Sequence, residues 1–146
     1  MAKRYITAKQ RQLVIERAAE RCEYCQCWVA YAIQSFDVDH IIPVSRGGAS
    51  TLDNLAYACS GCNRHKLNWV DAFDLVEQQT VALFHPRLDR WQEHFQWNDD
   101  YTLMIGLTPT GRVTVAALQL NRQGVVNLRK LLHRIGQHPP SLATDK

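Results

Sequence analysis

Residues 59–66 of this 146-residue chain read CSGCNRHK. Two cysteines separated by two residues can present both sulfurs to one metal ion from a single turn. An asparagine, an arginine, a histidine and a lysine follow the second cysteine directly. The stretch therefore predicts a metal clip at the start of a helix, and it raises the question whether Asn63 or His65 takes part in a reaction beside that clip.

The same cysteine spacing recurs in CEYC at residues 22–25. Structural zinc takes four tetrahedral ligands, so the two pairs together predict one structural Zn²⁺ site with the ligands Cys22, Cys25, Cys59 and Cys62. Two unrelated pairs of core cysteines are the alternative. The fifth cysteine, Cys27, is interpreted as a spare, partly buried thiol, because Cys-x-Cys chelates a metal less well than Cys-x-x-Cys.

The segment between the two pairs is longer than the roughly 15–20 residues that separate the pairs of a simple zinc ribbon. It contains FDVDHIIPVSRGG at residues 36–48 and TLDNL at residues 51–55. A carboxylate such as Asp39 suits Mg²⁺ or Mn²⁺, and an imidazole such as His40 can accept a proton near neutral pH. Outside such a context, an Asp-His pair is more often an ordinary surface pair.

At these residues the chain resembles the HNH endonucleases. The family pattern has an acidic-His pair, a proline, a Gly-Gly loop, an Asn-Leu pair, and a Cys-x-x-Cys followed by Asn or His and then Lys. The matching residues here are Asp39-His40, Pro43, Gly47-Gly48, Asn54-Leu55, Cys59, Cys62, Asn63 and Lys66. The resemblance spans residues 22–68. It implies an α+β fold with a ββα-metal (His-Me finger) core stapled by the four-cysteine zinc site, followed by a C-terminal α/β extension.

The resemblance also implies the roles of the site residues in a metal-dependent DNA endonuclease. His40 is expected to be the general base, and Asp39 and Asn63 to hold a catalytic Mg²⁺ or Mn²⁺. Asn54 is expected to brace the loop through hydrogen bonds to the backbone. The alternatives are purely structural roles: Asn63 could cap a helix, and Asn54 could be an ordinary turn residue.

The order of the family pattern favours Asn63 over His65, which makes the chain an H-N-N variant. His65 lies two residues further on, about 200° around a helix, so the two side chains cannot face one ion from regular helical positions. His65 is kept as a possible substrate contact. Arg46, Arg64 and Lys66 flank the pattern and are expected to contact DNA phosphates; solvated surface charges are the alternative.

The pattern divides the chain into an HNH nuclease domain with an N-terminal helix at residues 1–70 and an extension of unknown role at residues 71–146. In the first part, helical spacing predicts a helix over 7–21 with Thr7 as its N-cap. Alternation predicts a strand over 35–39. A helix is predicted to start after Cys62 and to run to residue 79.

The extension is predicted to contain a helix, a β-hairpin and a second helix. Aromatic residues at helical spacing indicate the first helix over 84–97. Pro109 and Gly111 favour a hairpin turn within residues 102–115. An amphipathic pattern predicts the last helix over 121–135.

The net charge of +3 supports nucleic-acid binding only weakly, although the excess of basic residues lies in the half with the cysteines. No apolar run is long enough for a membrane span, and the first residues lack the apolar core of a secretory signal, so we expect a cytoplasmic protein. DNA is the expected partner, with no membrane, and the oligomeric state is open between monomer and homodimer. The competing hypothesis is a zinc-stapled nucleic-acid-binding module without cleavage activity.

Overall fold

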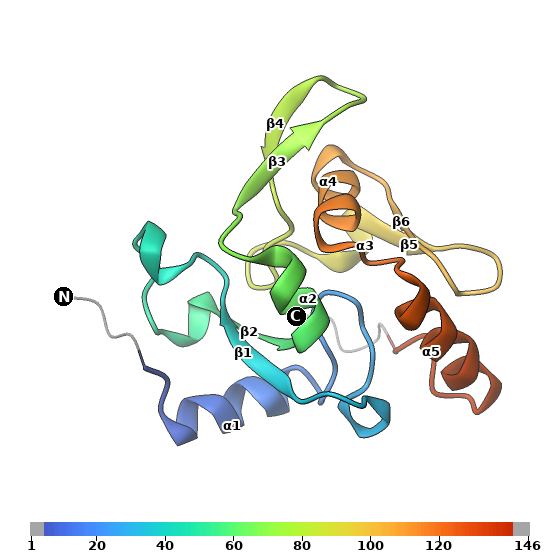
Figure 1. Cartoon of the computed structure of the whole chain (residues 1–146), viewed down its shortest axis with the longest axis horizontal. Coiled ribbons are helices and arrows are strands. Elements are labelled where there is room, and N and C mark those ends of the chain that lie inside the picture. The colour runs from blue at the N-terminus through green and yellow to red at the C-terminus, as the bar shows by residue number, and fades with distance from the viewer. Residues whose placement is uncertain (1–4, 142–146) are drawn as a thin grey trace. The chain divides into compact units, whose positions relative to one another are not determined.

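The computed structural model describes residues 5–141 and has a mixed α/β fold (Figure 1). The chain forms two compact units. The first contains the residues up to Val70 together with His85–Leu88, and the second contains Asp71–Phe84 and the residues from Asp89 on. None of the helices in the described part of the chain has the length and apolar character needed to cross a membrane.

The first unit is built on an antiparallel hairpin followed directly by a helix. Its elements are α1 (Ala8–Arg17), η1 (Val29–Tyr31), β1 (Phe36–His40), η2 (Val44–Arg46), η3 (Leu52–Asn54), β2 (Leu55–Cys59) and α2 (Ser60–Lys66). In the hairpin, Phe36 lies opposite Cys59 and His40 lies opposite Leu55. Helix α2 packs against both strands (Figure 1). It ends where Leu67 adopts a φ of 52°, which is outside the helical region.

Helix α1 begins as the sequence predicts. The side chain of Thr7 accepts a hydrogen bond from the backbone N–H of Gln10, and the Gln10 side chain accepts one from the backbone N–H of Thr7, so the two residues form a capping box. The helix ends at Arg17, earlier than predicted, because Ala19 and Glu20 both have positive φ. Arg17 donates to the carbonyl oxygens of Leu52 in η3 and Leu55 at the start of β2, which ties the helix to the hairpin.

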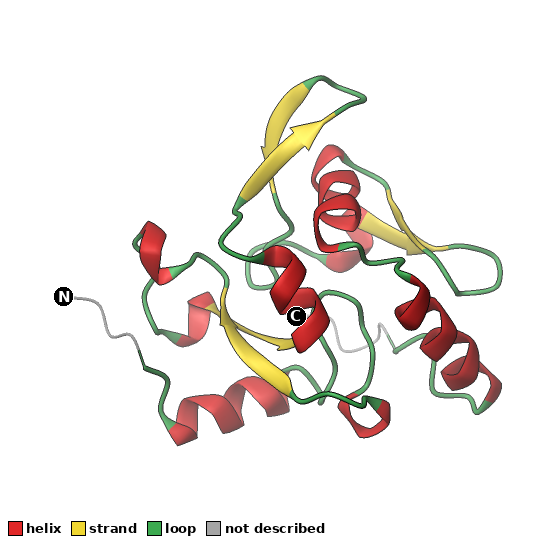
Figure 2. Cartoon of the chain, in the orientation of Figure 1, coloured by secondary structure: helices red, strands yellow, loops and turns green. Residues whose placement is uncertain are grey.

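The second unit contains two more antiparallel hairpins and two longer helices (Figure 2). Its elements are β3 (Asp71–Asp74), β4 (Gln79–Ala82), α3 (Trp91–His94), β5 (Phe95–Trp97), β6 (Met104–Gly106), α4 (Pro109–Leu118) and α5 (Gln123–Arg134). Helix α4 packs against β6 and β3. The last helix, α5, confirms the prediction to within two residues at each end.

The core of the second unit includes a guanidinium group. Arg129 on α5 is 1% exposed and donates to the carbonyl oxygens of Thr102 and Leu120 and to the side-chain oxygen of Asn121. Its guanidinium carbon lies 5.0 Å from the ring centre of Trp97. Carbonyl oxygens and an aromatic face therefore stabilise this buried charge.

The helix predicted to continue from Cys62 to residue 79 is wrong beyond Lys66. Residues 71–82 form the β3–β4 hairpin instead. The buried Asp74 accepts a hydrogen bond from the backbone of Glu77, which shapes the turn, and both of its oxygens bind Arg112, at 3.0 and 2.9 Å. Arg112 is far along the chain, so the local pattern gave no indication of this anchor.

The hairpin predicted with its turn at Pro109 and Gly111 is also wrong. Strand β6 ends at Gly106, and Pro109 is the first residue of α4. The side chain of Thr108 caps this helix by accepting a hydrogen bond from the backbone of Gly111. A Cβ on Gly111 would lie 2.1 Å from the carbonyl oxygen of His94, so close packing also requires the glycine. The helix predicted over 84–97 shortens to the single turn of α3, because Phe95–Trp97 pairs as β5.

The Asp74–Arg112 pair predicts an acid-sensitive anchor. Hydrogen bonding from Arg112 lowers the pKa of Asp74 to about 2 from the ordinary 3.8. The folded-state pKa is the lower one, so the pair contributes stability above about pH 3.8 that is lost as the pH falls through about 2. We expect Arg112→Gln to raise the pKa of Asp74, measured by NMR at its carboxyl carbon. Arg90→Gln removes an exposed ion pair and should leave that pKa unchanged.

Candidate active site

The four paired cysteines meet in the first unit. Their Sγ atoms all lie within 4.8 Å of one another, and all four residues are buried. The Sγ atoms of Cys25 and Cys59 are 3.8 Å apart. A tetrahedral zinc ion with Zn–S bonds of about 2.3 Å holds its sulfurs about 3.8 Å apart, so the cluster is compatible with zinc.

Each pair forms a turn in which a backbone N–H points at the first sulfur. Cys25 donates to the Sγ of Cys22 at 3.3 Å, and Cys62 donates to the Sγ of Cys59 at 3.4 Å. Cys27 is buried with its Sγ 3.3 Å from that of Cys25, and it is not one of the four mutually close cysteines. It thus lies beside the cluster rather than within it, in agreement with its interpretation as a spare thiol.

The four clustered cysteines differ in the direction of their pKa shifts. Burial raises the pKa of Cys22 well above its ordinary value. Sulfur hydrogen bonds, the largest from Cys22, lower the pKa of Cys59. Only thiolates are effective zinc ligands, so zinc affinity at this cluster should fall as the pH is lowered.

The carboxylate of Asp39 lies in the interior with two partners. The Nζ atom of Lys66 is 3.1 Å from its Oδ2, and the hydroxyl of Tyr24 donates to the same oxygen at 3.3 Å. Lys66 is 2% exposed, so this ion pair is shielded from water. Burial raises the pKa of Asp39, and attraction to Lys66 opposes that rise. Burial also raises the pKa of Tyr24, which remains a donor at neutral pH.

Two polar side chains of helix α2 lie over one face of β1. Asn63 and Lys66 are three residues apart on the helix, and Asp37 and Asp39 are two residues apart on the strand, so each pair shares a face. The Nδ2 atom of Asn63 donates to Asp37 at 3.3 Å, next to the pair of Lys66 with Asp39. Sequence reasoning missed Asp37; its two-residue spacing from Asp39 was the signal that could have found it.

His40 is the last residue of β1, and its half-buried ring binds Ser50, with 2.7 Å between Nε2 and Oγ. Adjacent strand residues point to opposite faces, so His40 can share a site with Asp39 only if the strand ends or bends there. The strand does end at His40. Among the described residues, however, no hydrogen bond joins the His40 ring to Asp39. Ser50 was another residue that sequence reasoning did not select.

The bracing contacts expected of Asn54 are present. Its Oδ1 accepts from the backbone N–H of Ile42 at 2.8 Å, and its Nδ2 donates to the carbonyl oxygens of Ile42 and Ala49 at 3.0 and 2.9 Å. The loop passes so close that a Cβ on Gly48 would lie 1.7 Å from the Ile42 oxygen. A glycine is therefore required where Asn54 holds the chain that follows β1.

The residues expected to contact DNA differ in their exposure. Arg46 and Arg64 are exposed, and Arg46 also donates to the carbonyl oxygen of Asn68 at 2.8 Å. His65 is half-buried. Lys66 is buried and bound to Asp39, so a phosphate contact through its ammonium group would require this ion pair to open.

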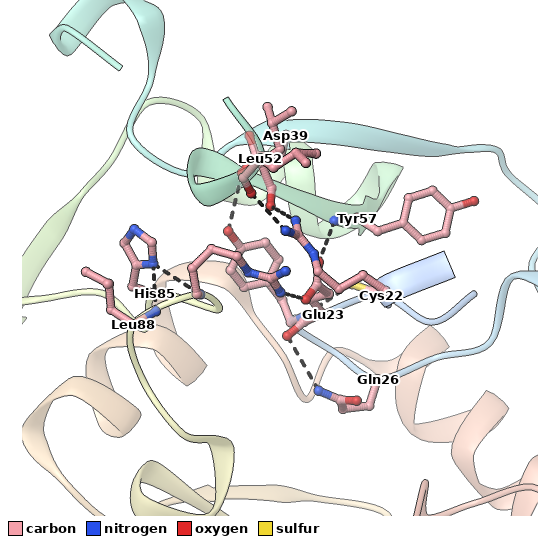
Figure 3. Close-up of polar contacts among 12 residues, drawn as sticks. Cys22, Glu23, Gln26, Asp39, Leu52, Tyr57, His85 and Leu88 are labelled. Atoms are coloured by element: carbon pink, nitrogen blue, oxygen red, sulfur yellow. Dashed lines mark hydrogen bonds and ion pairs between the residues drawn. The ribbon is translucent and has the colours of Figure 1, made fainter. Parts of the chain in front are cut away.

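A second buried ion pair joins Glu23 in the first cysteine turn to Arg87 (Figure 3). Glu23 follows Cys22 and exchanges hydrogen bonds with the backbone of Tyr57 on β2: its carboxylate accepts at 2.9 Å and its N–H donates at 2.8 Å. Arg87 pairs with the other carboxylate oxygen, and both side chains are about one-tenth exposed. Burial lowers the pKa of Arg87 to about 10, which leaves the guanidinium charged at neutral pH. This contact explains why His85–Leu88 belongs to the first unit.

The zinc interpretation predicts opposite results for two cysteine variants. Cys59→Ser removes one of the four clustered ligands and should abolish zinc binding and unfold the first unit, because structural zinc supplies folding energy. Cys27→Ser should retain one zinc ion per chain and the native circular dichroism spectrum. Metal analysis and circular dichroism of both purified variants are the measurements. Equal zinc content in the two would contradict the assignment.

Because the Glu23–Arg87 pair is buried, removal of Arg87 should destabilise the protein strongly, and a second substitution at Glu23 should restore much of that stability. Arg87→Met leaves a buried carboxylate without its counter-charge and should lower the free energy of unfolding by about 3–5 kcal/mol. Adding Glu23→Gln removes that charge and keeps an acceptor for Tyr57, so the double variant should regain much of the loss. Denaturant unfolding of the wild type, the two single variants and the double variant gives the four free energies needed, and additive losses would count against the pair.

Comparison with known proteins gives one match. No curated protein and no solved structure matches the chain significantly. The family model of the HNH endonucleases matches residues 22–68, which include both cysteine pairs and the polar face of β1. The resemblance seen in the sequence is thereby confirmed over residues 22–68, the part of the chain that the family model matches.

Proposed function

We propose that this protein is a metal-dependent endonuclease that hydrolyses phosphodiester bonds in DNA, with β1, β2 and α2 as its ββα-metal core. The observation that carries the proposal is the packing of α2 on β1. It brings the amide of Asn63 onto the strand face that holds Asp37 and Asp39, directly beside the four-cysteine cluster. A nuclease activity in general agrees with the family match.

The donor set on this face fits a hard divalent cation. Asp39 offers carboxylate oxygen and Asn63 offers amide oxygen, both of which suit Mg²⁺ or Mn²⁺. Asn63 uses its NH₂ group to bind Asp37, and this contact turns its Oδ1 away from Asp37 and leaves it available. When bound, such a cation would neutralise negative charge on the phosphate and on the leaving oxygen.

The hydrogen bond of His40 suits a general base. If Nε2–H donates to Ser50, the other ring nitrogen, Nδ1, is unprotonated and can take a proton from the attacking water. An imidazole titrates near neutral pH, and the half-buried ring leaves room for substrate. Asn54 supports this arrangement through the chain that links His40 to Ser50.

Positive groups around this face would bind the phosphate backbone. Arg46 and Arg64 are exposed, and His65 is half-buried on the same helix as Asn63. Contacts to phosphate fix the position of DNA without reading its sequence. The proposal therefore includes Arg46, Arg64 and His65, together with Lys66 if its ion pair opens.

The test of the general base is a plasmid nicking assay with Mg²⁺, Mn²⁺ and EDTA. His40→Ala should reduce cleavage by about 10²–10⁴-fold, the usual contribution of general acid–base catalysis, with zinc content unchanged. EDTA added briefly should stop cleavage by the wild-type protein. Cleavage by His40→Ala at the wild-type rate would exclude His40 as the base.

A matched pair of variants decides between the two candidates after the second cysteine pair. Asn63→Ala removes a proposed cation ligand and should raise the Mg²⁺ concentration needed for cleavage by about 10-fold or more. His65→Ala should leave that concentration unchanged and reduce only DNA affinity. The reverse result would assign the ligand to His65.

One observation favours a second candidate function, a zinc-stapled nucleic-acid-binding module without cleavage activity. Asp39 is already neutralised by Lys66 in the interior, and a buried ion pair of this kind can serve structure alone. In that case DNA binding in a gel-shift assay would persist in Asp39→Asn, and no metal would support nicking by the wild-type protein.

A further inference from the structure

One carboxylate oxygen of Asp39 is bound by two residues, each of which lies close in sequence to a different cysteine pair. The hydroxyl of Tyr24 and the ammonium of Lys66 bind the same atom, Oδ2. Tyr24 lies between Cys22 and Cys25 in the first turn, and Lys66 lies on the helix that contains Cys62. The position of this carboxylate therefore depends on the metal cluster through two separate contacts.

The Tyr24 side chain is well suited to orient a carboxylate. It is 2% exposed, and its backbone N–H points at the Sγ of Cys22 at 3.4 Å, so the residue is fixed at both ends. Phenylalanine would fill the same space without the hydroxyl. The specific contribution of tyrosine here is the hydrogen bond to Asp39.

The two oxygens of Asp39 are not equivalent. Oδ2 has a hydroxyl and an ammonium as partners, whereas within residues 5–141 no hydrogen bond or ion pair involves Oδ1. Holding one oxygen fixes the rotation of the carboxylate and the direction in which the other points. Oδ1 is thus the atom that a cation on this face could bind, through a single oxygen.

We propose that Tyr24 is a positioning residue for the candidate active site: its hydroxyl holds Oδ2 of Asp39 so that Oδ1 binds the divalent cation. The cysteine cluster then orients this carboxylate and also stabilises the fold. The inference rests on the proposed function, since it assumes that Asp39 binds the cation. It adds a residue within the Cys-x-x-Cys turn to the residues on β1 and α2. Partners that orient a metal ligand typically account for 10–100-fold in metal affinity or activity.

The test uses Mn²⁺ as the probe and the full chain. Tyr24→Phe should raise the Mn²⁺ dissociation constant, measured by electron paramagnetic resonance, by about 10-fold, with one zinc ion per chain retained. Tyr57→Phe is the matched control, because Tyr57 is also in the first unit and its hydroxyl points away from Asp39 (Figure 3). It should bind Mn²⁺ like the wild-type protein. A Tyr24→Phe protein with wild-type Mn²⁺ affinity would overturn the inference.

A measurement on the wild-type protein covers the case in which Tyr24→Phe loses zinc or fails to fold. With ¹³C at the tyrosine Cζ, addition of Mg²⁺ should shift the Tyr24 resonance in a saturable way and leave the Tyr57 resonance in place. The Tyr24 shift should disappear in Asp39→Asn. No Mg²⁺-dependent change at Tyr24 would contradict the inference.

Failure of the positioning role of Tyr24 can be distinguished from failure of the nuclease function. If Asp39→Asn abolishes Mn²⁺ binding and nicking while Tyr24→Phe alters neither, the positioning role is wrong and the nuclease proposal stands. If the wild-type protein neither nicks DNA nor loses Mn²⁺ affinity on Asp39→Asn, both proposals are wrong.

Discussion

The first unit depends on one constraint: four sulfur atoms from two distant segments must meet around a single point. One pair follows α1, and the other spans the junction of β2 and α2. Because β2 is paired with β1, fixing the start of α2 also fixes which face of β1 the helix covers. Asn63 and Lys66 therefore lie over Asp37 and Asp39, and the polar face follows from the cluster.

Local spacing made part of this arrangement predictable. The cysteine pairs, the Thr7 cap and the last helix are properties of short stretches, and the structure has all three. The turn of β3–β4 was not predictable, because its anchor joins Asp74 to Arg112 far along the chain. Pro109 illustrates a different difficulty, since proline followed closely by glycine begins a turn or a helix equally well. In the candidate site, the resemblance to the family pattern indicated Asp39 and Asn63, whereas Tyr24 lies at a spacer position of the first cysteine pair and acquires its partner Asp39 only through folding.

The buried charges change the meaning of the sequence composition. Three of the basic residues that the structure describes are engaged inside the protein, with carboxylates or with carbonyl oxygens: Lys66, Arg87 and Arg129. A count of lysines and arginines therefore overstates the positive charge that an approaching phosphate would meet. Attraction to nucleic acid must depend on where the exposed groups lie, and Arg46 and Arg64 lie close to the candidate site in sequence.

The return of His85–Leu88 to the first unit has a consequence for the order of events during synthesis. The ribosome delivers both cysteine pairs before it delivers Arg87, with the β3–β4 hairpin in between. Glu23 therefore has no counter-charge until the β3–β4 hairpin and then Arg87 have been synthesised. The first unit is therefore completed late, by a segment that is synthesised only after the first residues of the second unit.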